Sequence, residues 1–109
     1  MMDHAAVEAM VKALPHVMLD YPFGEGVAVY KIGDSSGKMF ALIQEGSTPV
    51  RLSLKCDPQL AELLREKYET VVPGYHLNKK HWNTIICSGQ VPADELKDLI
   101  RHAYELVKD

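Results

Sequence analysis

The stretch VRLSLKCDPQLAELLREKY, residues 50–68, decides the fold class of this chain, because a strand pattern changes into a helix pattern within it. In its first six residues apolar side chains alternate with polar ones, which is the period of a strand with one buried face. Val50, Leu52 and Leu54 are therefore predicted to face the core, and the polar residues between them to face the other way.

The second half of the stretch predicts a helix from Asp57 to Tyr68. Asp57 is a favourable N-cap, and Pro58 at the first helical position needs no hydrogen-bond donor there. The apolar stripe predicted to be buried consists of Leu60, Leu63, Leu64 and Tyr68.

Outside this stretch, helices are predicted from Asp3 to Leu14 and from Pro92 to Lys108. The β-rich runs VAVYKI, KMFALI and two shorter runs, Glu69 to Val72 and Trp82 to Cys87, are predicted to be strands. The order α-β-β-β-α-β-β-α predicts one α+β domain over residues 1–109, a two-layer α/β sandwich. Its sheet is expected to be five-stranded and mainly antiparallel, with the helices on one face. The residues predicted to be buried together are Leu52, Leu54, Leu64, Ile86, Leu96 and Ile100.

The composition is that of a folded protein, with 47% hydrophobic and 25% charged residues among 109. The formal net charge of −3 argues against a general polyanion binder, since non-specific nucleic-acid affinity comes from phosphate neutralisation. The charge is uneven: Pro49 to Asn83 holds six Lys and Arg against four Asp and Glu. A positive surface is therefore expected from the middle of the chain.

Two cysteines, Cys56 and Cys87, stand without CxxC spacing and are predicted to be free, buried thiols. They indicate a reducing compartment, and no apolar run has the length of a membrane span, so a cytoplasmic protein without membrane contact is expected. Cys56 precedes a predicted helix N-terminus, where a thiol pKa can be lowered. A cysteine-dependent enzyme therefore stays open as a functional alternative. It ranks third, after the DNA-binding and protein-binding hypotheses given below.

A metal site is not expected. His76, His81 and Cys87 are spaced by five and six positions, unlike the tight pairs typical of zinc ligands. No phosphate-loop or dinucleotide-binding motif is complete either, so no cofactor is predicted.

The segment from Tyr75 to Asn83 gathers aromatic, histidine, lysine and asparagine side chains in nine positions. One hypothesis is recognition of a nucleic acid or another acidic partner, with the lysines at phosphates, the amides at polar groups and the rings stacking. The alternative is a structural hairpin, in which Pro73 and Gly74 form a turn and the aromatic rings cap the core edge.

Several segments resemble the MmcQ/YjbR family of small bacterial proteins, and together they cover nearly the whole chain. They are YPFGEGVAVYKI, GKMFAL, RLSLKCDPQLAELLREKY, VVPGYHLNKKHWNTI and VPADELKDLIRHAYELV. The resemblance implies a frataxin-like or secretion-chaperone-like two-layer fold, a proposed DNA-binding role through a double-wing motif and no established enzymatic activity. The positions that it implies for DNA contact are Arg51, Lys55, His76, Asn78, Lys79, Lys80, His81, Trp82 and Asn83.

The leading functional hypothesis is therefore a non-enzymatic DNA-binding module. Its alternative is a protein–protein adaptor that receives an acidic partner on the basic-aromatic hairpin or on the sheet face.

Overall fold

The computed structural model describes residues 2–33, 37–74 and 77–108, which form three helices and six strands. The helices are α1 (His4–Lys12), α2 (Pro58–Lys67) and α3 (Ala93–Val107). The strands are β1 (Val17–Asp20), β2 (Val27–Ile32), β3 (Met39–Gln44), β4 (Arg51–Lys55), β5 (Val71–Pro73) and β6 (Trp82–Ile86). The predicted N-cap Asp57 accepts hydrogen bonds from the backbone of Gln59 and Leu60, and Asp3 caps α1 by accepting from Ala6 N at 2.9 Å.

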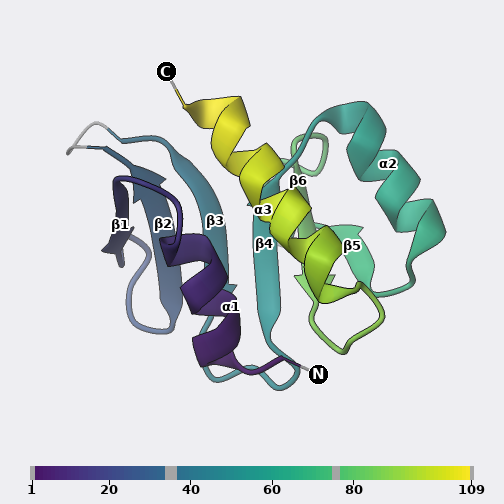
Figure 1. Ribbon diagram of the computed structural model, residues 1–109, viewed down its shortest axis with the longest axis horizontal. Coiled ribbons are helices and arrows are strands. Elements are labelled where there is room, and N and C mark those ends of the chain that lie inside the picture. The colour runs from purple at the N-terminus through teal and green to yellow at the C-terminus, as the bar shows by residue number, and fades with distance from the viewer. Residues whose placement is uncertain (1, 34–36, 75–76, 109) are drawn as a thin grey trace.

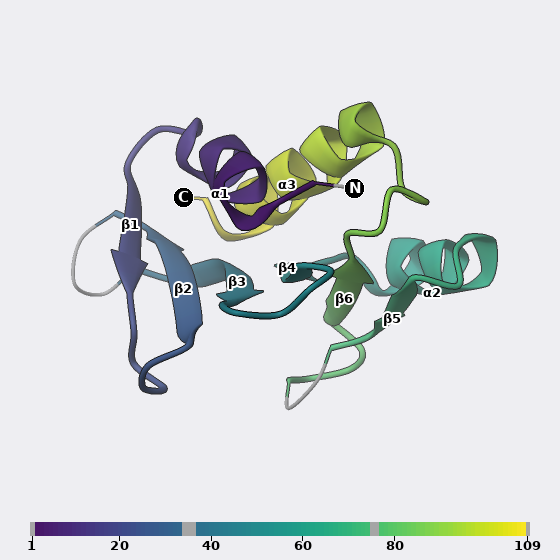
Figure 2. The ribbon, with the colours of Figure 1, turned by 90° about the horizontal axis from the view of Figure 1, so that it is seen from below.

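All six strands form one sheet in the order β1-β2-β3-β4-β6-β5, and every neighbouring pair is antiparallel. Figures 1 and 2 show α1 and α3 together over one face of this sheet, with α2 beside β5 at its end. The opposite face carries no helix of the described chain, and we call it the open face.

The prediction of five strands was wrong, because β1 adds a sixth at the edge of the sheet. β1 has only four residues, of which Met18, Leu19 and Asp20 are exposed, so it lacks the alternation that marks a half-buried strand. It forms because Val17 to Asp20 pairs with β2, a tertiary contact that local sequence does not reveal.

The main core lies between the sheet and the helices. Val50, Leu52 and Leu54 are buried there as predicted, together with Leu96 and Ile100 of α3. Phe40 and Tyr104 meet edge to face, with ring centroids 5.5 Å apart, and the Tyr104 hydroxyl donates to Pro15 O at 2.7 Å. α3 is thus fixed to both the sheet and the segment that follows α1.

Two predicted core positions were wrong. Ile85 rather than Ile86 joins the main core, since a shift of one residue along a strand moves a side chain to the other face. Leu63 is 61% exposed, and the smaller Ala61 is the buried residue on that part of α2.

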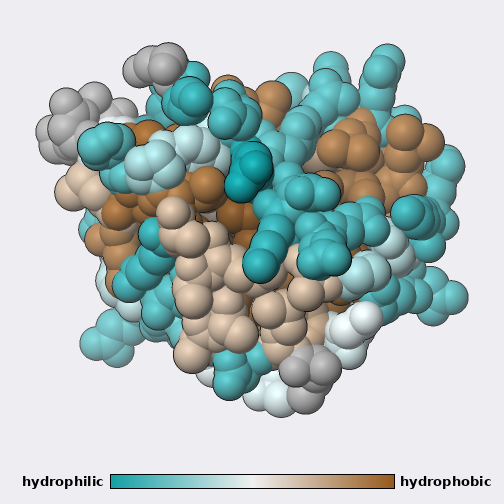
Figure 3. Space-filling view, in the orientation of Figure 1, coloured by the Kyte–Doolittle hydropathy of each residue, from teal (hydrophilic) through white to brown (hydrophobic). Residues whose placement is uncertain are grey.

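Figure 3 shows the helix side of the molecule, with a hydrophobic patch over α2 and mainly hydrophilic side chains over α3.

A second, smaller core lies on the open face. Val29, Leu42 and Trp82 are buried against one another there, and Leu77 packs beside them. The Trp82 ring therefore covers the side of the sheet that faces away from α1 and α3.

Candidate functional site: the basic loop and the open face

The segment between β5 and β6, of which residues 77–81 are described, carries two exposed lysines, Lys79 and Lys80. β4 ends beside it, since Lys55 pairs with Trp82 and Cys56 N donates to His81 O at 2.8 Å. We call Lys55, Lys79 and Lys80 the basic cluster. Among the residues that the structure describes, no carboxylate lies within ion-pair distance of these three lysines.

The backbone that carries the basic cluster is anchored by Arg65 of α2. The Arg65 guanidinium donates to Lys79 O, to Trp82 O at 3.4 Å, and through Nε to Asn83 Oδ1 at 2.7 Å. The Asn83 amide nitrogen donates in turn to Ala61 O at 3.2 Å. A guanidinium has several donors in a fixed plane, so one side chain can hold a helix and a loop in register.

Inside the loop, Asn78 has a structural role. Its side-chain oxygen accepts a hydrogen bond from Lys80 N at 2.9 Å, and its carbonyl accepts from His81 N at 3.1 Å. Asn78 thus forms the local turn that asparagine favours, and this turn places the two lysine side chains on the surface.

Close packing against Trp82 explains why the residue before this loop, Gly74, is a glycine. A Cβ added to Gly74 would lie 2.8 Å from the Trp82 Cβ, closer than two carbon atoms approach without displacement. Gly74 N also donates to Trp82 O at 3.0 Å. The glycine is needed because the β5 end runs directly against Trp82.

The predicted contact residues fall into separate groups. Trp82 and Asn83 are 6% and 2% exposed, so stacking by this ring and base contact by this amide do not fit the structure. Strand alternation separates the two side chains, with Trp82 on the open face and Asn83 toward α2. Tyr75 and His76 lie outside the described residues, and His81 is half-buried.

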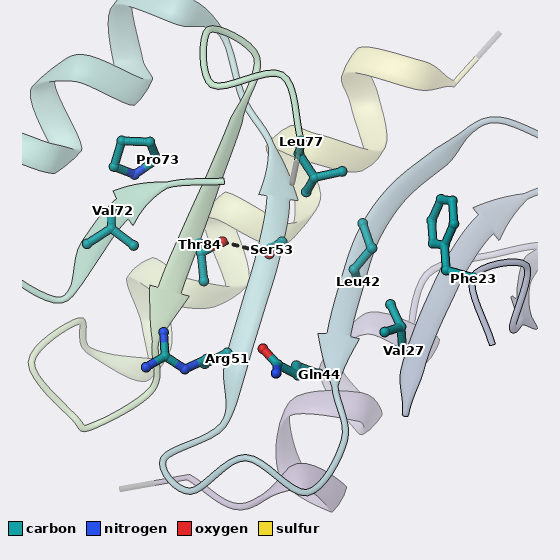
Figure 4. A pocket seen from close by; sticks show the side chains of 10 residues that line it. All are labelled: Phe23, Val27, Leu42, Gln44, Arg51, Ser53, Val72, Pro73, Leu77 and Thr84. Carbon is teal, nitrogen blue, oxygen red and sulfur yellow. Dashed lines mark hydrogen bonds between the residues drawn. The ribbon is translucent and has the colours of Figure 1, made fainter. Parts of the chain in front are cut away.

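Arg51 lies apart from the basic cluster. It begins β4, whereas Lys55 ends that strand, so four residues at about 3.3 Å each separate them by about 13 Å. Arg51 instead borders a hollow of about 670 Å³ on the open face. In Figure 4, Arg51 and Gln44 lie together at one end of this hollow. Leu77 lies at the other end, and the hydrogen-bonded pair Ser53 and Thr84 lies between.

Both cysteines are free and buried, as predicted. Burial raises the pKa of each thiol to about 11, and at Cys56 the neighbouring Asp57 carboxylate adds to the rise. The thiolate that a cysteine nucleophile requires is therefore disfavoured at both positions.

We predict slow alkylation of both thiols in the native protein. With a pKa of about 11, only about one Cys56 thiol in a thousand is ionised at pH 8, and the sulfur is also shielded from reagent. Iodoacetamide labelling at pH 8, followed by mass spectrometry, should be at least about a hundredfold slower in native than in urea-unfolded protein. Rapid native labelling at Cys56 would contradict this and favour the enzyme alternative.

Among the described residues, no three His, Cys, Asp or Glu side chains gather closely enough to hold a metal ion. His76, one member of the trio considered above, is outside that range. In the described part of the chain, no helix combines the length and the apolar content needed to cross a membrane.

Arg65 and Phe23 were missed by the sequence analysis. Arg65 comes directly after the buried Leu64 and belongs to the polar side of α2. The local sequence therefore does not predict that its guanidinium contacts the loop. Phe23 lies between β1 and β2, and nothing in the sequence indicated that its 61% exposed ring borders the hollow.

These features define a small α+β domain with an anchored basic loop and an open sheet face. A sequence model of the YjbR family matches residues 12–106, and the chain belongs to this family. The uncharacterised protein YbdF of Escherichia coli O157:H7 is 38% identical over 106 residues, covering 97% of this chain and 84% of YbdF. The uncharacterised protein YjbR of Escherichia coli K12 is 39% identical over 67 residues, covering 62% of this chain and 57% of YjbR.

Solved structures share the fold. The crystal structure of protein DR2400 of Deinococcus radiodurans, described as a DUF419 domain, superposes with a TM-score of 0.92 at 41% identity, covering 98% of this chain and 79% of DR2400. A crystal structure of a Pseudomonas syringae protein superposes with a TM-score of 0.80 at 28% identity, covering 99% of this chain and all of that one.

Proposed function

We propose that the chain is a non-enzymatic DNA-binding module that contacts phosphates through its basic cluster. The observation that carries the proposal is the anchoring of Lys79: its carbonyl is held by Arg65 while its side chain stays exposed beside Lys80. A lysine on a fixed backbone loses less conformational freedom when it meets a phosphate, so binding costs less.

The proposal agrees with the double-wing DNA binding and the frataxin-like or secretion-chaperone-like fold that the family resemblance implies, and with the cytoplasmic location expected from the free thiols. It narrows the group of residues expected to meet DNA. Lys55, Lys79 and Lys80 act by charge, with Asn78 and the half-buried His81 beside them, whereas the buried Trp82 supports the loop from beneath.

The test is charge reversal at the loop. Replacing Lys79 and Lys80 together by Glu should weaken binding to every duplex sequence and flatten the log–log salt dependence by roughly 0.9 for each phosphate that is no longer neutralised. Stability should change little, because exposed charges contribute little to folding. Fluorescence anisotropy on duplex and single-stranded DNA at several salt concentrations, with melting curves, measures both effects.

The matched control reverses two exposed charges on α3, Lys97→Glu with Arg101→Glu, which changes the net charge equally on the helix side. The control variant should keep more affinity than the loop variant. If wild-type protein does not bind at low salt, or if both variants lose affinity equally, DNA recognition by the loop is refuted.

A protein partner is the second candidate, and one observation favours it. Met18, Leu19, Tyr21 and Phe23, on and after edge strand β1, are 38–61% exposed. Exposed apolar side chains gathered at one edge are typical of protein contacts. Binding of such a partner should respond weakly to salt, unlike phosphate binding.

A further inference from the structure

The hollow on the open face has the size and walls of a small-molecule site. Its volume of about 670 Å³ lies within the range of about 300–1,000 Å³ that ligand pockets occupy. Phe23, Val27 and Leu42 line the β2–β3 side, Val72 lines the β5 side, and Leu77 closes one end. These apolar walls can hold the apolar body of a ligand. The polar side chains of the hollow lie at one end, where Arg51 is, and on the floor, where Ser53 and Thr84 are.

The floor of the hollow offers a hydrogen-bond donor. Ser53 Oγ and Thr84 Oγ1 lie 2.8 Å apart, and Thr84 is only 3% exposed. Two hydroxyls have two protons but use only one in their mutual hydrogen bond. When Thr84 donates to Ser53, the proton of the half-buried Ser53 hydroxyl stays available to an acceptor atom in the hollow, which Ser53 lines.

Arg51 adds positive charge at the end opposite Leu77. Its backbone nitrogen is fixed by Ser47 Oγ at 3.1 Å, and Gln44, its partner across β3 and β4, lies beside it. Among the described residues, no carboxylate forms an ion pair with the Arg51 guanidinium, and no acidic side chain lines the hollow. The charge and the donors therefore match an anionic acceptor such as a carboxylate, which a guanidinium can bind in bidentate geometry.

We propose that the hollow binds a small amphipathic carboxylate, with its carboxylate at Arg51 and its apolar body between Leu42 and Leu77. The proposal is independent of DNA binding, since the basic cluster lies at the other end of β4. In this proposal Arg51 binds a small anion within an apolar hollow, whereas Lys79 and Lys80 bind phosphates at the loop surface.

The test compares two probes that share one apolar body, 4-phenylbutyrate and 4-phenyl-1-butanol, in titrations monitored by amide NMR shifts of the ¹⁵N-labelled protein. The carboxylate should shift the amide signals of Leu42, Ser53 and Thr84 and should bind about tenfold more tightly than the alcohol, because it forms a charge-assisted hydrogen bond that the alcohol cannot form. Arg51→Gln should reduce the affinity for the carboxylate to about that for the alcohol and leave the alcohol affinity unchanged.

Two controls separate this site from others. Arg101→Gln makes the same chemical change on the helix side and should leave both affinities unchanged. Lys79→Gln with Lys80→Gln should also leave them unchanged, so a failure of DNA binding would not affect this result. The proposal is overturned if the probes bind equally, if the shifts map outside the open face, or if millimolar 4-phenylbutyrate shifts nothing.

Discussion

Trp82→Ala is expected to lower the free energy of unfolding by about 3–5 kcal/mol, the usual cost of removing a buried tryptophan ring. Trp82 is 6% exposed and, with Val29 and Leu42, forms the small core on the open face. In the described part of the chain no helix lies on that side of the sheet to close over the space, so the neighbouring side chains can fill only part of the cavity. The expected result is a much lower urea midpoint with an unchanged slope, measured by circular dichroism.

The same variant separates a core ring from a stacking ring. If Trp82 supports the fold, DNA affinity should fall only in proportion to the unfolded fraction. If the ring stacks on a base, affinity should fall by about 1–3 kcal/mol in fully folded protein, with the salt slope nearly unchanged. Phe23→Ala is the matched control, because its ring is 61% exposed and its loss should change stability by less than about 0.5 kcal/mol. Normal stability of Trp82→Ala would contradict the core assignment.

The fold was predictable where a strand or helix buries one face. The alternation around Leu52 placed the main core correctly, and the predicted burial of Leu96 and Ile100 did the same for α3. β1 was missed because an exposed edge strand needs no alternation; only its pairing with β2 reveals it. The error between Ile85 and Ile86 has a related cause: both faces of β6 are covered, so apolar character does not show which residue faces α3.

The candidate site was predictable as a charged segment but not as a set of contacts. The lysine pair indicated the exposed loop, whereas polarity alone suggested that Asn83 would also face solvent. Its burial depends on Arg65, which approaches from a helix 18 residues away in sequence. The hollow was missed because it assembles side chains from five strands and two loops, each of which is ordinary in its local sequence.

Asn83→Leu is expected to lower the free energy of unfolding by about 2–3 kcal/mol. Leucine has the same branched shape, but it would leave Arg65 Nε and Ala61 O without their partner in a part-buried and a buried place, and an unsatisfied buried polar group costs about 1–3 kcal/mol. Arg65→Met should cost about 1–3 kcal/mol for the same reason, because it leaves Asn83 Oδ1 unpaired and releases the carbonyl of Lys79.

The double variant tests whether the two side chains act as one unit. Once Asn83 is leucine, replacing Arg65 removes a hydrogen bond that no longer exists, so the two costs should overlap by about 1–2 kcal/mol. Urea unfolding of the wild type, both single variants and the double variant measures this coupling energy. Glu62→Gln, an exposed change on the same helix, should cost less than about 0.5 kcal/mol. Strictly additive costs would show that Arg65 and Asn83 stabilise the protein separately, and the anchoring of the basic loop through this pair would then be refuted.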